Sequence, residues 1–379
     1  MLKKVRVEQL YDLYTYELDF ENTDNCPMKF ITGPNGYGKS TMLNMIYAML
    51  THDCDVLFKT PFALFQLTFD DAVVTLTQKR EYTQDDKSDI EKLVSQSMHI
   101  EYETSTGEVE IGDMEPQGDC PMPDLIMYLS GLSAYYMDDK RVVHNTIDAN
   151  KENISDVVGR LNADALLLQD LIELHQIDFS SPVFEKGEVI SEKEYKDRVE
   201  RISENLKPLK RWGMVNQEFE PIAYMQVVDN ILRKYLDDLE FKINIHREFI
   251  DQLRMFESLV ANSFFADKSL RMNNKLGFCF YSESKHKEPL TPEKLSSGER
   301  HLLLQLFELI FRAPKGALVL IDEPELSMHL YWQICYSKVL EEIANSRKLR
   351  CVVATHSPQI FDSMWSHCMD LYQLTKAAK

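Results

Sequence analysis

The sequence predicts an α/β fold with an antiparallel β-subdomain and an inserted α-helical arm. A glycine-rich loop, GPNGYGKST (33–41), lies between a short apolar strand and a helical pattern. A second apolar strand far downstream, ALVLIDEPE (317–325), ends in acidic residues. Between the two, strand-like alternation over 62–111 gives way to helical spacing over 150–260. We therefore expect an α/β core that is interrupted by a helical segment.

Length and composition narrow the class of protein. A chain of 379 residues is longer than one ordinary domain, and 44% hydrophobic residues suit a globular protein. The formal net charge of −19 repels nucleic-acid phosphates over most of the surface, so contact with DNA would need a local basic patch. We find no signal peptide and no run of about 20 apolar residues, and so expect a cytoplasmic protein without membrane contact.

The seven cysteines of the chain are scattered and form no CxxC pair. Such a set indicates reduced thiols rather than disulfides or zinc ligands.

The first block of the chain, 1–148, is predicted to hold the phosphate loop and the β-subdomain. Residues 3–20 alternate as two strands with a turn near Tyr11, and a short strand over 28–32 precedes the glycine-rich loop. Ser40 begins a helical pattern, so the loop has the strand-loop-helix context that phosphate binding requires. Two strand pairs follow over 62–82 and 98–111, then a helical stretch and a short strand.

The middle block, 149–261, is predicted to be a helical insertion. Apolar residues recur at helical spacing, and Glu220–Pro221 indicates the start of a helix of about 40 residues. The basic residues of this arm could contact DNA, but interleaved acids make a solvated helix face the simpler interpretation; they are Lys207, Lys210, Arg211, Arg233 and Lys234.

The last block, 262–379, is predicted to return to the α/β core. Strands are expected over 276–281, 317–322 and 350–355, with a helix over 330–345. LSSGER (295–300) is a polar loop that runs into an apolar helix, and ATHSP (354–358) is a loop after the last of these strands.

The glycine-rich loop satisfies the pattern G-x-x-x-x-G-K-S. Its glycines allow backbone amides to face phosphate oxygens, with Asn35, Gly36 and Gly38 lining the loop. Lys39 would neutralise the β- and γ-phosphates, and the Ser40 hydroxyl would ligate Mg²⁺. Thr41 would bind the α-phosphate.

Three further residues have chemistry that suits a phosphate site. Asp322 and Glu323 end a buried strand, where a parallel sheet presents ligand-binding residues. We expect Asp322 to hold Mg²⁺ and Glu323 to act as general base toward a water molecule. His356 follows another buried strand and would position that water beside the γ-phosphate. The simpler alternatives are a surface turn for DEPE and an ordinary core histidine.

The loop LSSGER offers a second anion-binding group. Ser296 caps a helix whose free amides attract an anion, and Gly298 and Glu299 follow in its first turn. An ordinary capped helix is the alternative.

In this order, the four pieces resemble those of ATP-binding-cassette (ABC) ATPases. The resemblance implies ATP and Mg²⁺ as ligands, ATP hydrolysis, and a homodimer in which Ser296, Gly298 and Glu299 reach the γ-phosphate held by the other copy. LSSGE, DEPELSMH and the residues at 11–20 are similar to the SMC-like and OLD-like ATPases, which include subunits of the Septu, PARIS and retron antiphage systems. This resemblance implies a switch that regulates a separate effector nuclease. The alternative is an SMC-like ATPase that binds DNA for repair or tethering.

The sequence departs from these families in three respects. OLD nucleases carry a Toprim domain after the ATPase, and the chain has no room for one after His356, so we expect the nuclease on another chain. The arm has no CxxC for a zinc hook. These ATPases usually carry a glutamine, the Q-loop residue, before the arm. In this sequence Lys140 occupies the expected position, and Gln66 is the alternative candidate for that glutamine.

Overall fold

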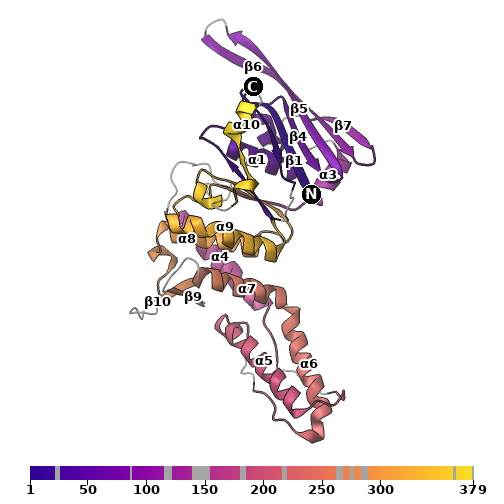
Figure 1. Cartoon of the computed structure of the whole chain (residues 1–379), viewed down its shortest axis with the longest axis vertical. Coiled ribbons are helices and arrows are strands. Elements are labelled where there is room, and N and C mark those ends of the chain that lie inside the picture. The colour runs from indigo at the N-terminus through magenta and orange to yellow at the C-terminus, as the bar shows by residue number, and fades with distance from the viewer. Residues whose placement is uncertain are drawn as a thin grey trace. The chain divides into compact units, whose positions relative to one another are not determined.

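The computed structural model describes residues 1–21, 26–85, 88–114, 122–138, 154–179, 185–215, 220–261, 268–273, 277–282, 289–361 and 364–377. Packing divides the chain into unit 1, Met1–Thr146 with Arg312–Lys379, and unit 2, Ile147–Phe311 (Figure 1). We describe each unit by itself. The domain boundaries that we predicted from the sequence, after residues 148 and 261, remain a prediction. Lys140, at the expected Q-loop position, lies outside the described residues.

The centre of unit 1 is a parallel sheet of five strands in the order β13-β3-β12-β11-β8. The inner strands read as nearly continuous apolar runs because both faces of the sheet are covered. The strands are β3 (Met28–Thr32), β8 (Ala134–Met137), β11 (Leu318–Asp322), β12 (Arg350–Ala354) and β13 (Cys368–Asp370). The prediction of an α/β core is confirmed, although β13 was not predicted.

A second sheet of unit 1 is antiparallel, in the order β2-β1-β4-β5-β6-β7, and confirms the predicted β-subdomain. The turns at 70–71 and 105–108 lie within the two predicted strand pairs, over 62–82 and 98–111. The β5–β6 hairpin extends well past its neighbours (Figure 1). The strands are β1 (Leu2–Leu10), β2 (Tyr14–Asp19), β4 (Leu64–Phe69), β5 (Ala72–Asp85), β6 (Ser88–Thr104) and β7 (Val109–Met114).

Helix α1 (Lys39–Leu50) joins the two sheets into one core. Eight of its twelve residues are buried, while Ser40 and Asn44, one turn apart on the same face, are exposed. Its apolar residues share a cluster with inward residues of the antiparallel sheet and with Leu320, Val352 and Ala354 of the parallel sheet. The start of α1 is thereby held at the carboxyl end of β3.

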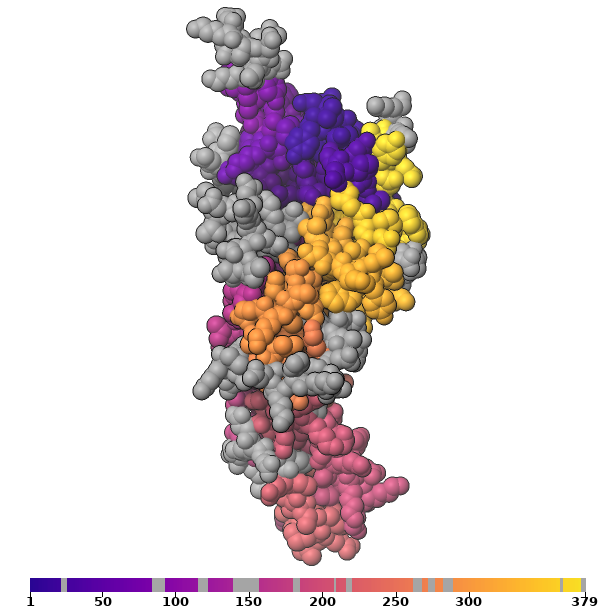
Figure 2. All heavy atoms as spheres, turned by 90° about the vertical axis from the view of Figure 1, so that its left-hand side faces the viewer, coloured from indigo at the N-terminus to yellow at the C-terminus, as the bar shows by residue number. Residues whose placement is uncertain are grey.

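In the described part of unit 1, four further α-helices accompany α1. The predicted helices near 125–132 and 330–345 are present, and α10 lies against β2 (Figures 1 and 2). These helices are α2 (Cys54–Lys59), α3 (Pro123–Ser130), α9 (Leu330–Arg347) and α10 (Leu371–Ala377).

Unit 2 is mainly helical and contains one antiparallel hairpin. Its core is aromatic: Phe307 packs against Phe256, Phe278 and Phe311 with ring centroids 4.9–6.0 Å apart. The elements are α4 (Ile154–Leu174), α5 (Glu192–Arg211), α6 (Asp229–Ile245), α7 (Arg247–Leu259), β9 (Lys268–Asn273), β10 (Gly277–Ser282), α8 (Ser297–Phe307) and a π-helical turn (Glu308–Arg312).

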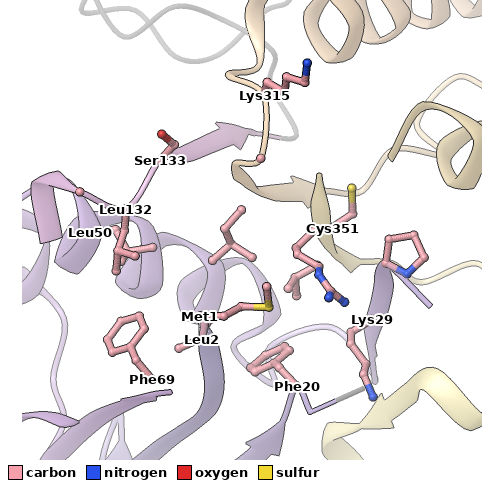
Figure 3. Close-up of a pocket in the computed structure, with 16 residues that line it drawn as sticks. Met1, Leu2, Phe20, Lys29, Leu50, Phe69, Leu132, Ser133, Lys315 and Cys351 are labelled. Atoms are coloured by element: carbon pink, nitrogen blue, oxygen red, sulfur yellow. The ribbon is translucent and has the colours of Figure 1, made fainter. Parts of the chain in front are cut away.

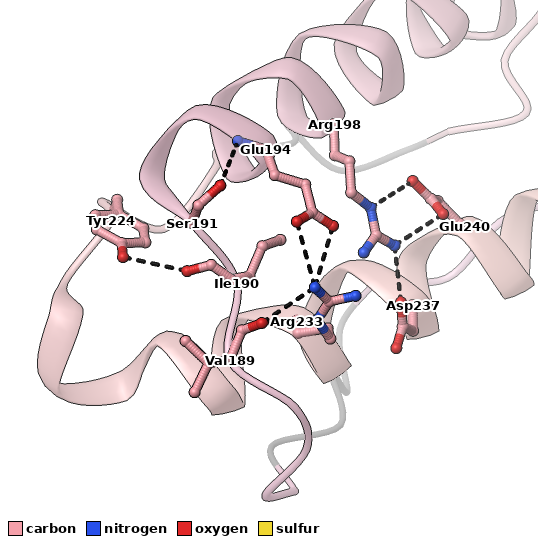
Figure 4. Close-up of polar contacts among 9 residues, drawn as sticks. All are labelled: Val189, Ile190, Ser191, Glu194, Arg198, Tyr224, Arg233, Asp237 and Glu240. Carbon is pink, nitrogen blue, oxygen red and sulfur yellow. Dashed lines mark hydrogen bonds and ion pairs between the residues drawn. The ribbon is translucent and has the colours of Figure 1, made fainter.

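The pairing of α5 with α6 depends on buried arginine contacts (Figure 4). The Arg198 guanidinium donates to both carboxylate oxygens of Glu240, at 3.0 and 2.8 Å, and to Asp237 at 2.8 Å. Arg233 bonds Glu194 and the carbonyl of Val189. Arg233 therefore contributes to packing within the arm. Whether the arm's basic residues contact DNA or form a solvated helix face stays a prediction.

The predicted helix of about 40 residues from Glu220 is wrong. A single 3-10 turn precedes α6, which begins at Asp229, and α6 ends at a break beside His246. Residues 220–225, before this turn, form no helix, and the Tyr224 hydroxyl donates to the Ile190 carbonyl (Figure 4). The Tyr195 hydroxyl likewise donates to a carbonyl of the same segment. Tertiary contacts therefore override the local helix-start signal.

Within the described part of the chain, no helix is both long and apolar enough to span a membrane. The six described cysteines are free thiols, as predicted.

Candidate nucleotide-binding site

The glycine-rich loop joins the end of β3 to the start of α1 in unit 1. Gly36 and Gly38 have φ values of 82° and 84°, a left-handed conformation that costs glycine little. Gly38 is the N-cap of α1, and no side chain caps this helix. The first-turn amides and the positive end of the helix dipole are thus left to an anionic ligand.

The residues predicted to bind phosphate and Mg²⁺ occupy different environments around this turn. Asn35, Gly36 and Ser40 are exposed and Thr41 is half-buried. The Thr41 hydroxyl lies 3.2 Å from the hydroxyl of Tyr11, at the β1–β2 turn. The exposed side of the loop is therefore open to a ligand.

Lys39 is buried at 4% exposure and folds back over its own loop. Its ammonium donates to the Gly33 carbonyl at 3.0 Å and lies 2.6 Å from Nε2 of His356. Burial lowers the pKa of Lys39, and the nearby carboxylates of Glu323 and Asp322 oppose this shift without cancelling it. A phosphate would offer this ammonium a stronger, charged partner.

Asp322 and Glu323 leave the end of β11 in different directions. Asp322 is buried at 2% exposure, and the Tyr136 hydroxyl of β8 donates to its Oδ2 at 3.5 Å. Glu323 is half-buried, with a φ of 44° that non-glycine residues seldom adopt. Its Oε1 lies 3.4 Å from Nε2 of His356. The positive φ turns Glu323 out of the strand toward the loop 354–358, which carries His356 and is called the histidine loop below.

Glu325 fixes the histidine loop and was not assigned a role from the sequence. Its Oε1 accepts hydrogen bonds from the Thr355 hydroxyl at 2.7 Å, the His356 amide at 2.7 Å and the Ser357 amide at 3.2 Å. These bonds set the position of His356 beside Lys39 and Glu323. The signal in the sequence was the third acid of DEPE, to which the sequence analysis gave no role.

Aromatic side chains support the other side of the glycine-rich loop. Tyr37 packs against Tyr14 with ring centroids 5.2 Å apart and against Tyr372 of α10 at 5.8 Å. The Tyr16 hydroxyl donates to the Tyr37 carbonyl at 3.0 Å. Tyr37 therefore anchors the loop to β2 and α10.

The described donors suit Mg²⁺ by type. Ser40 offers a hydroxyl and Asp322 a carboxylate, the hard oxygen ligands that Mg²⁺ prefers together with phosphate and water. Among the described residues, no group of three or more histidines, cysteines or acids could hold a metal. Mg²⁺ bound mainly through phosphates and water does not need such a group.

The LSSGER loop lies in unit 2, where Ser296 is the N-cap of α8. Ser296 and Glu299 form a reciprocal capping box, and Glu299 also pairs with Lys268 of β9. Burial acts to raise the pKa of Glu299, but hydrogen bonds from Lys268 and Ser296 outweigh it and lower the pKa. Ser296 is exposed and Gly298 buried. A ligand oxygen would have to share the Ser296 hydroxyl with Glu299.

The alternative Q-loop residue does not resemble a ligand-binding group. Gln66 lies within β4, and its amide donates to the Thr75 hydroxyl of β5 at 2.9 Å. Lys140 lies outside the described residues.

Comparison with known protein families finds one whose model matches part of the chain. Residues 175–362 match the family model described as "AAA domain, putative AbiEii toxin, Type IV TA system". The matched range contains the LSSGER loop, the acids of β11 and His356, while the glycine-rich loop precedes it. The chain is thus similar to AAA-type P-loop ATPases over this range.

One curated protein and three solved structures are also similar. Protein ea59 of Escherichia phage lambda is 29% identical over 76 residues, which are 20% of this chain and 14% of that protein. The chain thus matches only about a seventh of ea59.

The solved structures are SMC head domains. They are an SMC head bound to the C-terminal winged-helix domain of ScpA, a Pyrococcus furiosus head with an extended coiled coil bound to the C-terminal domain of ScpA, and the Thermotoga maritima head. Identities are 12%, 13% and 15%, coverage is 95–96% of this chain and 91% of each structure, and TM-scores are 0.38, 0.40 and 0.36. Scores this low assign no function.

Proposed function

We propose that this chain binds and hydrolyses ATP as a dimeric switch, and that Lys39, Asp322, Glu323 and His356 perform the chemistry. The observation that carries the proposal is the cluster at the carboxyl ends of β3, β11 and β12. There, His356 Nε2 lies 2.6 Å from the Lys39 ammonium and 3.4 Å from Glu323 Oε1, beside the uncapped start of α1. A cation, a carboxylate and an imidazole are gathered at an anion-binding helix end.

Each group has a distinct part in the proposed reaction. The amides of 36–41 and the Lys39 ammonium hold the phosphates, and Lys39 exchanges the Gly33 carbonyl for phosphate oxygens. Glu323 accepts a proton as the water oxygen bonds to the γ-phosphorus and the bond to the β,γ-bridging oxygen breaks, which releases ADP and phosphate. His356 orients the water.

Ser40 and Asp322 are the residues that would hold Mg²⁺. The ion would neutralise charge on the β- and γ-phosphates. Tyr136 fixes the Asp322 carboxylate for this purpose.

We propose further that ATP is enclosed between two copies, with Ser296, Gly298 and Glu299 of one copy facing the γ-phosphate held by the other. The exposed Ser296 hydroxyl at the start of α8 supports this role. In this scheme nucleotide holds the dimer together and hydrolysis releases it.

For the biological role, we propose the ATPase subunit of a bacterial antiphage system that regulates a separate effector nuclease. Support comes from the resemblance to antiphage ATPases and from the matched family, whose description names a toxin of a toxin–antitoxin system. Co-purification with the product of a neighbouring gene tests this role. Steeply salt-dependent DNA binding by the chain alone would instead favour the DNA-repair alternative.

The substitution Glu323→Gln tests the chemistry, since it keeps size and removes the base. We expect ATP turnover to fall by about 10²- to 10⁴-fold, while ATP affinity stays within about threefold of wild type. Turnover is followed by phosphate release and affinity by titration with a fluorescent ATP analogue. Glu342→Gln, an exposed position on α9, is the control. Undiminished turnover in Glu323→Gln would remove Glu323 from this role.

The same variant tests enclosure by two copies. With ATP and Mg²⁺, Glu323→Gln should elute as a dimer because the bound nucleotide persists. A monomer that retains bound ATP would refute the dimer.

A further inference from the structure

A pocket of about 400 Å³ lies in unit 1 at the end of the parallel sheet opposite the glycine-rich loop. It is lined by the starting residues of β11 and β12 and by residues next to the starts of β3 and β8. The candidate nucleotide site lies at the other ends of these strands. Since β11 and β12 each have five residues, about 16 Å of strand separates the two places. The pocket is therefore a different site.

The body of the pocket is apolar. Leu50, Phe69, Phe20 and Leu132 surround the hollow (Figure 3). Cys351 also lines it as a neutral thiol, because burial raises its pKa to about 12. The volume falls in the range of small-molecule sites, roughly 300–1,000 Å³. Such walls suit a hydrocarbon or aromatic body.

The charge of the pocket has one sign. Its lining residues include Lys29, Lys315 and Arg350, and none of the lining residues is acidic. Figure 3 shows Lys29 and Lys315 at opposite ends of the hollow. Within the described part of the chain, neither Lys29 nor Arg350 forms an ion pair.

Arg350 gives the strongest indication of a ligand. Its backbone is fixed in the sheet, with the amide donating to the Ala317 carbonyl at 3.0 Å. The residue as a whole is half-buried, and its Nη1 atom is enclosed by protein atoms without a hydrogen-bond partner in the described part of the chain. A guanidinium must carry its charge at any ordinary pH, so it cannot avoid the cost of burial by losing a proton. Enclosed charge is stable when it is paired.

We propose that this pocket binds a small carboxylate with an apolar body, such as a medium-chain fatty acid or an aryl acid. The carboxylate pairs with the Arg350 guanidinium, and the apolar body lies among Leu50, Phe69 and Leu132. A carboxylate accepts two parallel hydrogen bonds from a guanidinium, which a neutral alcohol or an amine cannot do. The proposal does not depend on ATP binding, since the two sites occupy opposite ends of the strands.

The test compares decanoate, decanol and decyltrimethylammonium as probes, below their aggregation concentrations, by calorimetric titration of the full chain. We expect decanoate to bind at least tenfold more tightly than either other probe and to raise the melting temperature. Equal binding of decanoate and decanol, or no binding of decanoate, would overturn the proposal. Displacement of a fluorescent ATP analogue by decanoate would place binding at the nucleotide site and would overturn it too.

Two variants locate the bound carboxylate. Arg350→Met keeps an apolar side chain of similar reach, and should weaken decanoate binding about tenfold, or 1.4 kcal/mol, without changing decanol binding. Leu132→Trp should fill the hollow and weaken both probes. Arg6→Met removes an exposed arginine of β1 that pairs with Glu8, and should leave decanoate binding unchanged.

Arg350→Met also separates a ligand-binding role from a structural one. Without ligand, this variant should melt at or above the wild-type temperature, because a half-buried charge without an ion pair is removed. A lower melting temperature together with unchanged decanoate affinity would show that Arg350 serves the fold, and would refute the proposal.

Discussion

Replacement of Glu325 should disorder the histidine loop while leaving the glycine-rich loop intact. One oxygen of this half-buried carboxylate accepts three hydrogen bonds, from the Thr355 hydroxyl and from the amides of His356 and Ser357. In Glu325→Ala, the hydroxyl of the wholly buried Thr355 and the His356 amide lose this acceptor, whereas the Ser357 amide keeps the Thr355 hydroxyl oxygen at 3.0 Å. Hydrogen bonds to charged groups contribute about 1.5–3 kcal/mol each, and the three are not additive because they share one oxygen.

From this geometry, Glu325→Ala should lower the free energy of unfolding of unit 1 by about 3 kcal/mol. Glu325→Gln keeps an acceptor oxygen but loses the charge, so its loss should be about 1 kcal/mol. In a unit of about 200 residues, 1 kcal/mol shifts the melting temperature by about 2–4 °C. Glu325→Ala should therefore melt about 6–12 °C lower than wild type, and Glu325→Gln about 2–4 °C lower.

The kinetic consequence follows from the position of His356. Its backbone amide is one of the three donors, so loss of Glu325 should displace the imidazole from Lys39 and Glu323. A displacement of about 1 Å costs roughly 10²-fold in rate, so kcat of Glu325→Ala should fall 10- to 100-fold and that of Glu325→Gln less. ATP affinity should change little, because Glu325 does not line the glycine-rich loop.

The assays are calorimetric melting and phosphate release, with Glu342→Ala as the exposed control that should change stability by less than about 0.5 kcal/mol. The reasoning would be refuted if Glu325→Ala melted within about 1–2 °C of wild type, which corresponds to less than about 1 kcal/mol, and hydrolysed ATP at an unchanged rate. Loss of ATP affinity equal to the loss of kcat would show that Glu325 supports the whole site rather than the histidine loop.

Two further predictions concern Lys39 and Ser296. The pKa of Lys39 is lowered in the folded chain, so the unfolded chain binds more protons and stability rises with pH as Lys39 loses its proton. Lys39→Met should therefore raise the melting temperature at neutral pH, although it should abolish ATP binding. The difference in melting temperature between variant and wild type should shrink toward pH 10.5. A variant that melts below wild type at neutral pH would contradict this prediction. Ser296→Arg should block ATP-dependent dimerisation, followed by light scattering, without weakening ATP binding by the monomer; an intact dimer would contradict the role of Ser296.

The sequence by itself determined the parallel core and the order of its motifs. Strands β3, β11 and β12 are apolar runs that end in the glycine-rich loop, in Asp322 and just before His356. Since parallel strands present their carboxyl ends at one edge, these motifs had to meet there. The turn at Gly38 could likewise be predicted, because its φ of 84° suits glycine.

Only the tertiary structure decided which side chains fix those motifs and where long helices end. Glu325 acts on a loop 30 residues away, and the Tyr224 hydroxyl donates to the carbonyl of Ile190. The pocket beside Arg350 likewise depends on walls from five strands (β1, β3, β4, β11 and β12), from α1 and from neighbouring loops. Periodicity and spacing report local backbone preference, whereas contacts between distant segments depend on how the elements pack, which no local pattern encodes.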